Sequence, residues 1–388
     1  MDIKLPKEVE FILNTLNNKG HEAFVVGGCV RDSIMGLKPH DWDITTSAEP
    51  TEVTKIFEKE KFKVLPTGIK HGTVTVMVNH EGFEITTFRI DGEYKDGRRP
   101  SNVSFTKSIK EDLARRDFTI NAIAFNPTDG LIDPFGGIND INDGIIRAVG
   151  DAKKRFEEDG LRILRAVRFC AKLNFKIDID TANSMLVCSH NLNNVSMERK
   201  RDELIKILLT DNPSSINTFI GFSIINTFLP EFCEALHSID KSKKNLPIRL
   251  AMMFNDCDTD TLQNELTRLR IDKRTIKQVV ILVDNINDIP VNEIMIRRRL
   301  NQIGENNFRN LIEIWKLEMN NISSIEKKLN DIIERGDCVT LKQLAVKGDD
   351  LVAMGIEGKN IKSTLEKLLN IVIENPSLNV KEKLLKLI

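Results

Sequence analysis

The sequence predicts a mixed α/β domain of about 145 residues, followed by an all-helical extension of about 240 residues. Two observations support this fold class. Up to about residue 150, short apolar and β-branched runs alternate with helical spacing and with turns that contain glycine or proline. After Asp151 the strand signals fade, and apolar residues recur with helical periodicity to the end of the chain.

Local patterns justify each element of the first part. Apolar spacing at Val9, Ile12 and Leu16 predicts a helix over residues 6–18. Apolar and β-branched runs predict strands at 23–26, 41–45, 72–78 and 83–89. Helices are expected at 51–60 and 108–115, and a hairpin is expected from 121–125 and 131–132. The polar, charged and glycine-containing segment 90–102 is expected to be a flexible loop.

Composition excludes several classes of protein. The 56 Lys and Arg residues nearly balance the 57 Asp and Glu residues, which excludes a uniformly basic nucleic-acid coat. The 6 cysteines form no CxxC pair, which argues against a zinc site and a disulfide scaffold. The N-terminus has no apolar signal region, and no run of about 18 uncharged apolar residues predicts a membrane span. We therefore expect a cytoplasmic protein that does not interact with a membrane.

A glycine turn is the first motif with chemical meaning. The strand at 23–26 runs into Gly27 and Gly28, and a helix is expected to open at Cys29. Glycines let backbone N–H groups approach an anion, and Arg31 in the first helical turn can bind a phosphate. Alone, the pattern also fits a plain tight turn with a surface arginine.

Three carboxylates follow the turn. Asp41 and Asp43 are two residues apart, so on a strand they would point to the same face. Adjacent carboxylates repel each other unless a cation lies between them, and oxygen-only ligands favour Mg²⁺ or Mn²⁺. Glu84, in an otherwise apolar strand, would complete a three-carboxylate site for two metal ions if the two strands were neighbours. A solvated turn and an outward-facing glutamate are the alternatives.

Two polar segments suit a nucleotide. Arg116, Asp117 and Asn121 are too concentrated for an ordinary core strand, and they offer donors for phosphate and acceptors for ribose. Further on, three-residue spacing should align four charged side chains on one stripe of a helix: Asp159, Arg162, Arg165 and Arg168. With Asp159 orienting Arg162, such a pair can read the Watson–Crick edge of a base. The alternative is an exposed stripe with one Asp–Arg pair.

With these motifs in order, the chain resembles the class II tRNA nucleotidyltransferases of bacterial type, the CCA-adding enzymes of the tRNA nucleotidyltransferase/poly(A) polymerase family. Nine motifs carry the resemblance over about the first 210 residues. They are GGCVRD at 27–32, HDWDITT at 40–46, GIKHGTVTV at 68–76, EITTFR at 84–89, YKDGRRPSNVSF at 94–105, RRDFTINAIAFN at 115–126, IDPFGGINDI at 132–141, EDGLRILRAVRF at 158–169 and SMERKRDEL at 196–204. The match is looser at 296–308 and 341–369.

The resemblance implies an α/β nucleotidyltransferase-type head, a mixed sheet with helices, followed by an all-α neck, body and tail. The implied bounds are 1–145 for the catalytic head, 146–208 for the base-reading neck, 209–325 for the body and 326–388 for a tRNA-binding tail. The implied reaction adds C, C and A to the tRNA 3′ end from CTP and ATP, without a nucleic-acid template and with release of pyrophosphate.

The resemblance also implies residue roles. Asp41 and Asp43 would bind two Mg²⁺ ions, with Glu84 as the third catalytic carboxylate. The remaining implied residues would bind the nucleotide. Triphosphate is assigned to Gly27, Gly28 and Arg31; phosphate and ribose to Arg116, Asp117 and Asn121; the base to Asp159 and Arg162, supported by Arg165 and Arg168.

Alternatives within the family stay open to different degrees. Poly(A) polymerases carry a basic stretch where this chain has PTGIKHGTV at 66–74, and CC-adding enzymes resemble a deletion of the loop that this chain keeps at 90–100. An A-adding enzyme keeps the loop and remains the closest rival. A catalytically dead tRNA-binding protein would lack a carboxylate, and a small-molecule nucleotidyltransferase has no use for the helical extension. Because Asn255 and Asp256 replace the His-Asp pair of some relatives, no hydrolase activity is expected. The sequence leaves the oligomeric state open.

Overall fold

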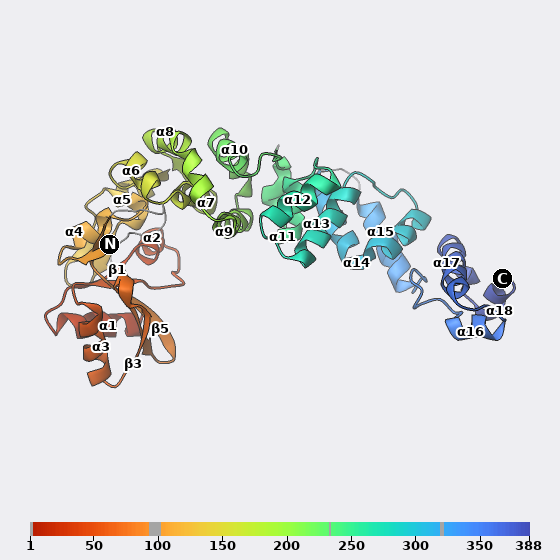
Figure 1. The fold of residues 1–388 in the computed structure, drawn as a ribbon, viewed down its shortest axis with the longest axis horizontal. Helices are drawn as coiled ribbons and strands as arrows, with labels where there is room; N and C mark the ends of the chain where they lie inside the picture. The colour runs from red at the N-terminus through yellow and green to blue at the C-terminus, as the bar shows by residue number, and fades with distance from the viewer. Residues whose placement is uncertain (1–2, 93–101, 233, 319–321) are drawn as a thin grey trace. The chain divides into compact units, whose positions relative to one another are not determined.

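The computed structural model describes residues 3–92, 102–232, 234–318 and 322–388. The backbone forms two compact units, Met1–Pro230 and Glu231–Ile388, and Figure 1 draws the elements of each. The mixed α/β part and the first helices of the extension belong to unit 1, and the remaining helices form unit 2. The described helices include none that is long and apolar enough to cross a membrane.

A seven-stranded mixed sheet forms the centre of the first unit, with the order β3-β4-β5-β2-β1-β8-β9. Its strands are β1 (Ala23–Val26), β2 (Ile44–Thr46), β3 (Lys63–Gly68), β4 (Thr73–Val78), β5 (Glu81–Thr87), β8 (Ala124–Asn126) and β9 (Gly130–Ile132). Among the described strands of this sheet, only β2 and β5 pair in parallel, with Ile44 opposite Ile85. β1 lies between β2 and β8 and pairs antiparallel with both, which brings the glycine turn next to both partner strands.

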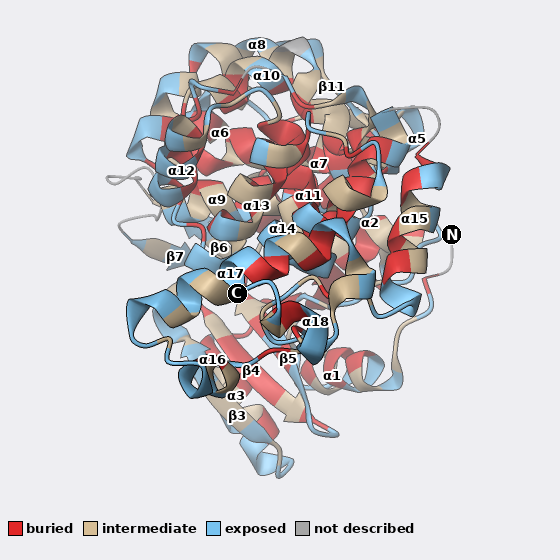
Figure 2. Ribbon diagram, turned by 90° about the vertical axis from the view of Figure 1, so that its right-hand side faces the viewer, coloured by how far each residue is buried: buried red, intermediate tan, exposed pale blue. Residues whose placement is uncertain are grey.

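The core of the sheet explains why β1 is central. All four residues of β1 are buried, and Phe24 and Val26 pack in one cluster with Phe88, Leu113 and Ala122. Continuous apolar strands of this kind are covered on both faces. Figure 2 shows the buried positions along the strands and on the inner sides of the helices.

Helices surround the sheet and continue beyond it in the first unit. They are α1 (Lys7–Asn17), α2 (Gly28–Ile34), α3 (Pro50–Lys59), α4 (Ile109–Ala114), α5 (Gly137–Asp143), α6 (Ala152–Glu158), α7 (Leu161–Leu173), α8 (Ile179–Val187), α9 (Met197–Leu208) and α10 (Phe219–Asn226). Two small strand pairs accompany them, β6 (Arg89–Asp91) with β7 (Val103–Phe105), and β10 (Ile145–Ile146) with β11 (Lys176–Ile177). The polar stripe of α7 faces the site described below.

The described residues of the second unit form helices joined by turns and loops, with no strand among them. It contains α11 (Leu246–Met253), α12 (Thr259–Arg268), α13 (Lys273–Asn285), α14 (Glu293–Glu318), α15 (Ser323–Glu334), α16 (Gly348–Ala353), α17 (Lys359–Glu374) and α18 (Lys381–Leu385). Near the C-terminus, a separate core forms around Leu344, Val346, Leu351 and Val372. Gly304 interrupts α14 with φ 76° and ψ 164°, a conformation that is nearly exclusive to glycine.

Three local predictions were wrong, and most of a fourth lies outside the described residues. The strand expected at 41–45 begins only at Ile44, so Asp41 and Asp43 lie in the segment before β2. β3 was missed because it is an edge strand with no buried residue and therefore lacks a clear apolar pattern. The loop expected at 90–102 overlaps β6 at Ile90 and Asp91 and stops just before β7, and its residues 93–101 lie outside the described part. Strands do not stop at residue 151, because β11 lies beyond it and pairs with β10. The sequence contains no signal for β11, since a strand of two residues is too short to show an apolar pattern.

Candidate active site

The carboxylate pair Asp41 and Asp43 lies directly before β2. The N–H of Val26 donates to the carbonyl oxygen of Asp43 over 3.0 Å, which fixes this backbone beside β1. Water still reaches the Asp43 carboxylate, but the protein atoms that crowd it raise its pKa. The nearby charges act in opposite directions, since Arg116 lowers the pKa of Asp43 and Asp41 raises it. The two carboxylates therefore repel each other as they stand, and a cation between them would relieve that repulsion.

Glu84 lies in the middle of β5, the strand that pairs with β2. Ile44 of β2 pairs with Ile85 of β5, so Asp43 and Glu84 each directly precede a paired residue. Glu84 is exposed. Within the described ranges, no group of three or more His, Cys, Asp or Glu side chains is close enough to hold a metal ion. The role of Glu84 as a third carboxylate stays a prediction.

The glycine turn faces an arginine. Gly27 has φ 80° and ψ −127°, which favours glycine, and a Cβ built there would lie 3.0 Å from Nη1 of Arg116. Arg116 Nη2 is 3.6 Å from Asp112, and its buried Nε has no hydrogen-bond partner among the described residues. Burial lowers the pKa of Arg116, while Asp112 and Asp43 raise it. A cation with a spare donor therefore lies between the turn and the carboxylate pair, where it can attract an anion.

Arg31 is already occupied inside the protein. Its side chain is buried, and its Nε and Nη2 donate to Asp32 over 2.8 and 2.6 Å. Nη1 donates to Oδ1 of Asn121 over 2.5 Å. The expected contact of Arg31 with a triphosphate stays a prediction, and in this structure Arg31 connects α2 to Asn121.

Asp117 is the most strongly held carboxylate of the site. Its Oδ1 accepts hydrogen bonds from the N–H of Phe118 and from Nδ2 of Asn121, and its Oδ2 accepts from Nε and Nη2 of Arg165 over 2.8 and 2.5 Å. Burial by itself would raise the pKa of Asp117, but the charge and hydrogen bonds of Arg165 outweigh burial and lower the pKa to about 2. Asp117 is therefore a fixed anion that holds Arg165 in place.

A cavity of about 280 Å³ brings half of the ten predicted nucleotide residues together. Its lining consists of Arg115, Arg116, Asp117, Asp159, Leu161, Arg162, Arg165 and Arg199. Five of these eight were predicted from the sequence. Gly27, Gly28, Arg31, Asn121 and Arg168 lie outside this lining. Five arginines and two carboxylates around one open volume can bind a phosphate and present both donors and acceptors to a base.

The expected Asp159–Arg162 pair was wrong. Asp159 ends α6 instead of lying on α7, and its carboxylate binds Arg199 of α9 over 2.8 Å. Arg162 instead pairs with Glu158 over 2.6 Å and donates to the carbonyl oxygens of Arg155 and Arg115. The corner at Gly160 turns the chain out of the helical stripe, so the three-residue spacing does not continue from Asp159 onto α7.

Gly160 allows this corner to exist. A Cβ at this position would lie 2.7 Å from the carbonyl oxygen of Asn191, which is closer than side chains permit. The close approach places the backbone of the corner against the turn after α8. Asp159 and Leu161 on either side of Gly160 both line the cavity.

Sequence reasoning missed Arg115 and Arg199 as site residues. Arg199 lies in the SMERKRDEL segment, which had been noted for resemblance without a role. Its contact with Asp159 joins residues 40 positions apart, and helical spacing within α9 contains no signal for such a contact. Arg168 pairs with Glu203 of the same α9 over 2.6 Å, which fixes α7 against α9.

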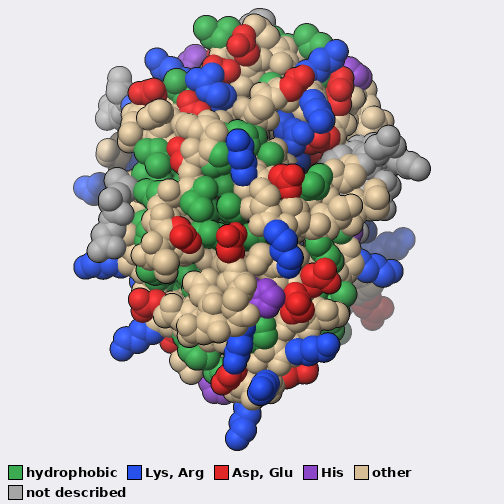
Figure 3. Space-filling model, turned by 90° about the vertical axis from the view of Figure 1, so that its left-hand side faces the viewer, with side chains coloured by type: hydrophobic (Ala, Val, Ile, Leu, Met, Phe, Trp, Pro, Cys, Tyr) green, Lys and Arg blue, Asp and Glu red, His purple; other side chains and the backbone are tan. Residues whose placement is uncertain are grey.

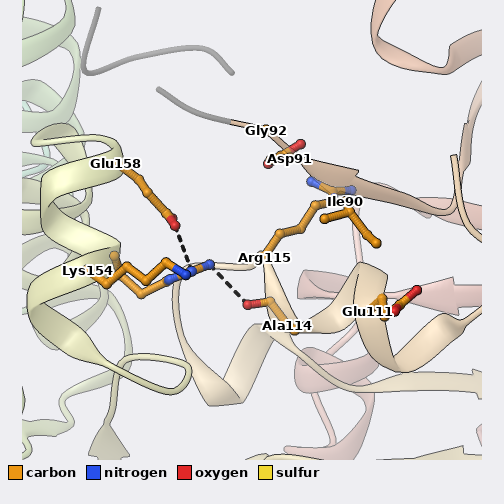
Figure 4. Close-up of a pocket in the computed structure, with 9 residues that line it drawn as sticks. Ile90, Asp91, Gly92, Glu111, Ala114, Arg115, Lys154 and Glu158 are labelled. Carbon is orange, nitrogen blue, oxygen red and sulfur yellow. Dashed lines mark hydrogen bonds and ion pairs between the residues drawn. The ribbon is translucent and has the colours of Figure 1, made fainter. Parts of the chain in front are cut away.

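A larger cavity of about 570 Å³ is drawn in Figure 4, and it shares the lining residue Arg115 with the first cavity. It is lined by Ile90, Asp91, Gly92, Glu111, Ala114, Arg115, Lys154, Arg155 and Glu158. Arg155 bridges Glu158 at 2.6 Å and the carbonyl oxygen of Ala114 at 3.1 Å. Figure 3 shows basic and acidic side chains interspersed on one face of the molecule, in agreement with the balanced composition.

Comparison with known proteins places these features in a family. Residues 23–147 match the poly A polymerase head domain, and residues 174–236 match the "Probable RNA and SrmB- binding site of polymerase A". Residues 242–388 match tRNA nucleotidyltransferase domain 2. The CCA-adding enzyme of Ligilactobacillus salivarius is 35% identical over 97% of this chain and 94% of its own length. The chain belongs to the CCA-adding enzyme family.

Other members of the family agree over the whole length. The CCA-adding enzyme of Staphylococcus haemolyticus is 35% identical over 100% of this chain and 98% of its own. The crystal structure of the Bacillus stearothermophilus CCA-adding enzyme in complex with CTP has a TM-score of 0.78 and 28% identity, and the similarity covers 97% of this chain and 94% of that one. The Thermotoga maritima CCA-adding enzyme complexed with tRNA shares the fold, with a TM-score of 0.70. As a CCA-adding enzyme family member, the chain is a nucleotidyltransferase with a mixed-sheet head and a mostly helical remainder.

Proposed function

We propose that this protein adds C, C and A in turn to the 3′ end of tRNA from CTP and ATP, without a nucleic-acid template. The observation that carries the proposal is full-length similarity to CCA-adding enzymes, combined with the cavity that gathers Asp117, Asp159, Arg162 and Arg165. The tRNA, CTP and ATP are all available in the cytoplasm, where we propose that the protein works.

The proposed step is one nucleotidyl transfer, repeated three times. The 3′-hydroxyl oxygen of the tRNA attacks the α-phosphorus of the bound nucleotide and gives up its proton to water, and the bond from the α-phosphorus to the bridging oxygen breaks. Pyrophosphate leaves with that electron pair. Arg116, next to the glycine turn and within electrostatic reach of Asp43, is placed to hold the phosphates.

Asp41 and Asp43 are the residues proposed to hold divalent metal, most simply Mg²⁺. Their donor set fits, because both groups are hard oxygen ligands. Burial raises the pKa of Asp43, and the charge of Asp41 acts in the same direction, against the lowering effect of Arg116. When bound, the metal would supply charge for the attacking hydroxyl and the departing pyrophosphate. Glu84 is proposed as an additional carboxylate, because it directly precedes Ile85, the partner of the residue that follows Asp43.

Selection of C and A is assigned to Asp159 and Arg162 in the cavity. Asp159 has acceptor capacity for an exocyclic amino group, which cytosine and adenine both carry, and Arg162 can donate to a ring nitrogen or carbonyl oxygen. Uracil lacks that amino group. Asp117, held as an anion by Arg165, is proposed to fix the sugar and the wall of the cavity.

The test uses two tRNA substrates, one that lacks CCA and one that ends in CC, each incubated with radiolabelled CTP or ATP. Full CCA addition predicts C incorporation into the first substrate and A incorporation into the second. Incorporation of A alone would identify an A-adding enzyme. Repeated addition of A to both substrates would identify a poly(A) polymerase. Incorporation of neither nucleotide would overturn the proposal.

A further inference from the structure

The ring of Phe169 in α7 collects three guanidinium groups within the described part of the chain. The Cζ atoms of Arg31, Arg165 and Arg168 lie 5.3, 5.5 and 4.3 Å from its centroid. Phe169 is 4% exposed, so these contacts are shielded from water. Phe118 packs on the same ring edge-on, with centroids 5.7 Å apart. An ordinary core phenylalanine packs against apolar groups, whereas this ring is in contact with cations.

Each of the three cations already has a carboxylate partner of its own. Arg31 pairs with Asp32, Arg165 with Asp117, and Arg168 with Glu203. The ring is therefore not needed to neutralise charge. It provides instead a shared surface that attracts guanidinium groups that would otherwise repel one another.

Four side chains and the ring form a closed circuit. Arg31 donates to Asn121, Asn121 donates to Asp117, and Asp117 accepts from Arg165. Phe169 closes the circuit, because both Arg165 and Arg31 lie over it. Arg31 belongs to the helix that starts at the glycine turn, and Arg165 lines the 280 Å³ cavity. The circuit thus joins the turn to the cavity.

We propose that Phe169 is a positioning residue for nucleotide selection, which couples Arg31 at the glycine turn to Arg165 at the base-reading cavity. The inference rests on the proposed function, since Arg165 and Asp117 are taken to hold the nucleotide. An aliphatic residue of similar size would fill the space but would leave both guanidinium groups over a surface without a quadrupole. Arg165 would then be held only by Asp117, so its guanidinium group would be positioned less firmly at the cavity.

The experiment compares Phe169→Leu with Phe57→Leu. Phe57 is also fully buried and also has an edge-on aromatic partner, Phe62, at 6.4 Å. No arginine among the described residues lies over its ring. Each variant is assayed for C addition, A addition, UTP misincorporation and melting temperature.

For Phe169→Leu we expect KM for CTP and ATP to rise about tenfold and the CTP-over-UTP preference to fall about tenfold, with kcat nearly unchanged. Phe57→Leu should lower only the melting temperature.

The outcomes separate the two proposals. If the wild type adds C and A but Phe169→Leu keeps the KM and nucleotide preference of Phe57→Leu, Phe169 is a packing residue and this inference is wrong. If the wild type adds neither nucleotide, the proposed function fails on its own. Should Phe169→Leu not fold, Phe169→Met, which keeps an unbranched apolar side chain, is judged by the same two quantities.

Discussion

The carboxylate pair before β2 and the arginine-rich cavity beside α7 are opposite electrostatic designs within one unit. Around Asp41 and Asp43, like charges stand close together, and burial raises the pKa of Asp43. In the cavity, each carboxylate has an arginine partner, and Arg165 lowers the pKa of Asp117 to about 2 against the burial that would raise it. The carboxylate pair needs a bound cation to offset its repulsion, whereas the carboxylates of the cavity are already held by their arginine partners. The comparison suggests that chemistry depends on the first region, and that selection depends on the second.

The largest effect should come from the carboxylate pair. Asp43→Ala removes one of two proposed metal ligands, so both C and A addition should fall about a thousandfold or more. Binding of tRNA, measured by filter retention, should change little, because Asp43 makes no proposed contact with the tRNA backbone. Asp143→Ala, an exposed carboxylate on α5, is the matched control and should retain activity. Normal A addition by Asp43→Ala would contradict the assignment.

A smaller effect, on selection and not on chemistry, should follow from changes to Asp159. Asp159→Ala removes the proposed acceptor for the exocyclic amino group and frees Arg199 from its 2.8 Å ion pair. The ratio of kcat/KM for CTP over UTP should fall about a hundredfold, and kcat for CTP should fall less. Primer-extension assays with each nucleotide alone measure both values. Strict fidelity in the variant would show that another group reads the base.

The ion pair of Asp117 in the cavity should make the stability of the fold depend on pH. The pKa of Asp117 is about 2 in the folded protein, against an ordinary value of 3.8, so its ion pair stabilises the fold above pH 4. That contribution, about 2 kcal/mol, is lost as the pH falls from 4 towards 2. Urea unfolding should show it in the wild type, and Asp117→Asn should be less stable at pH 7 and should lack this part of the acid loss. An identical pH profile in both proteins would contradict the assignment.

The smallest effect is expected from Arg199, one of the two cavity arginines that the sequence did not predict. Arg199→Gln removes the charge that orients Asp159 but leaves the carboxylate itself in place. We expect about a tenfold loss of CTP-over-UTP preference, less than for Asp159→Ala. Arg201→Gln, on the same helix and outside the cavity lining, is the control. Equal losses for Arg199→Gln and Arg201→Gln would argue for a general effect on α9.

What the sequence predicted and what it missed have physical reasons. The buried run of β1 and the glycine turn are local signals, and both were confirmed. The start of β2 was predicted too early, because Asp41 and Asp43 continue the alternating pattern of the strand, although the strand itself begins only at Ile44. Arg199 and the partner of Arg162 depend on how α6, α7 and α9 pack, which no spacing within one helix reveals. Arg31 was expected to be open to a ligand, and only the structure shows its pairing with Asp32 and Asn121.

The corner at Gly160 has a consequence for how the gene can vary. Since a Cβ there would lie 2.7 Å from a backbone oxygen of Asn191, alanine is already too large at this position. In a saturation library selected for growth, position 160 should therefore tolerate as few codons as position 159, although glycine offers no group to a substrate. Conversely, a second-site change that restores function to Gly160→Ala should fall in the 189–194 segment, whose backbone would have to yield.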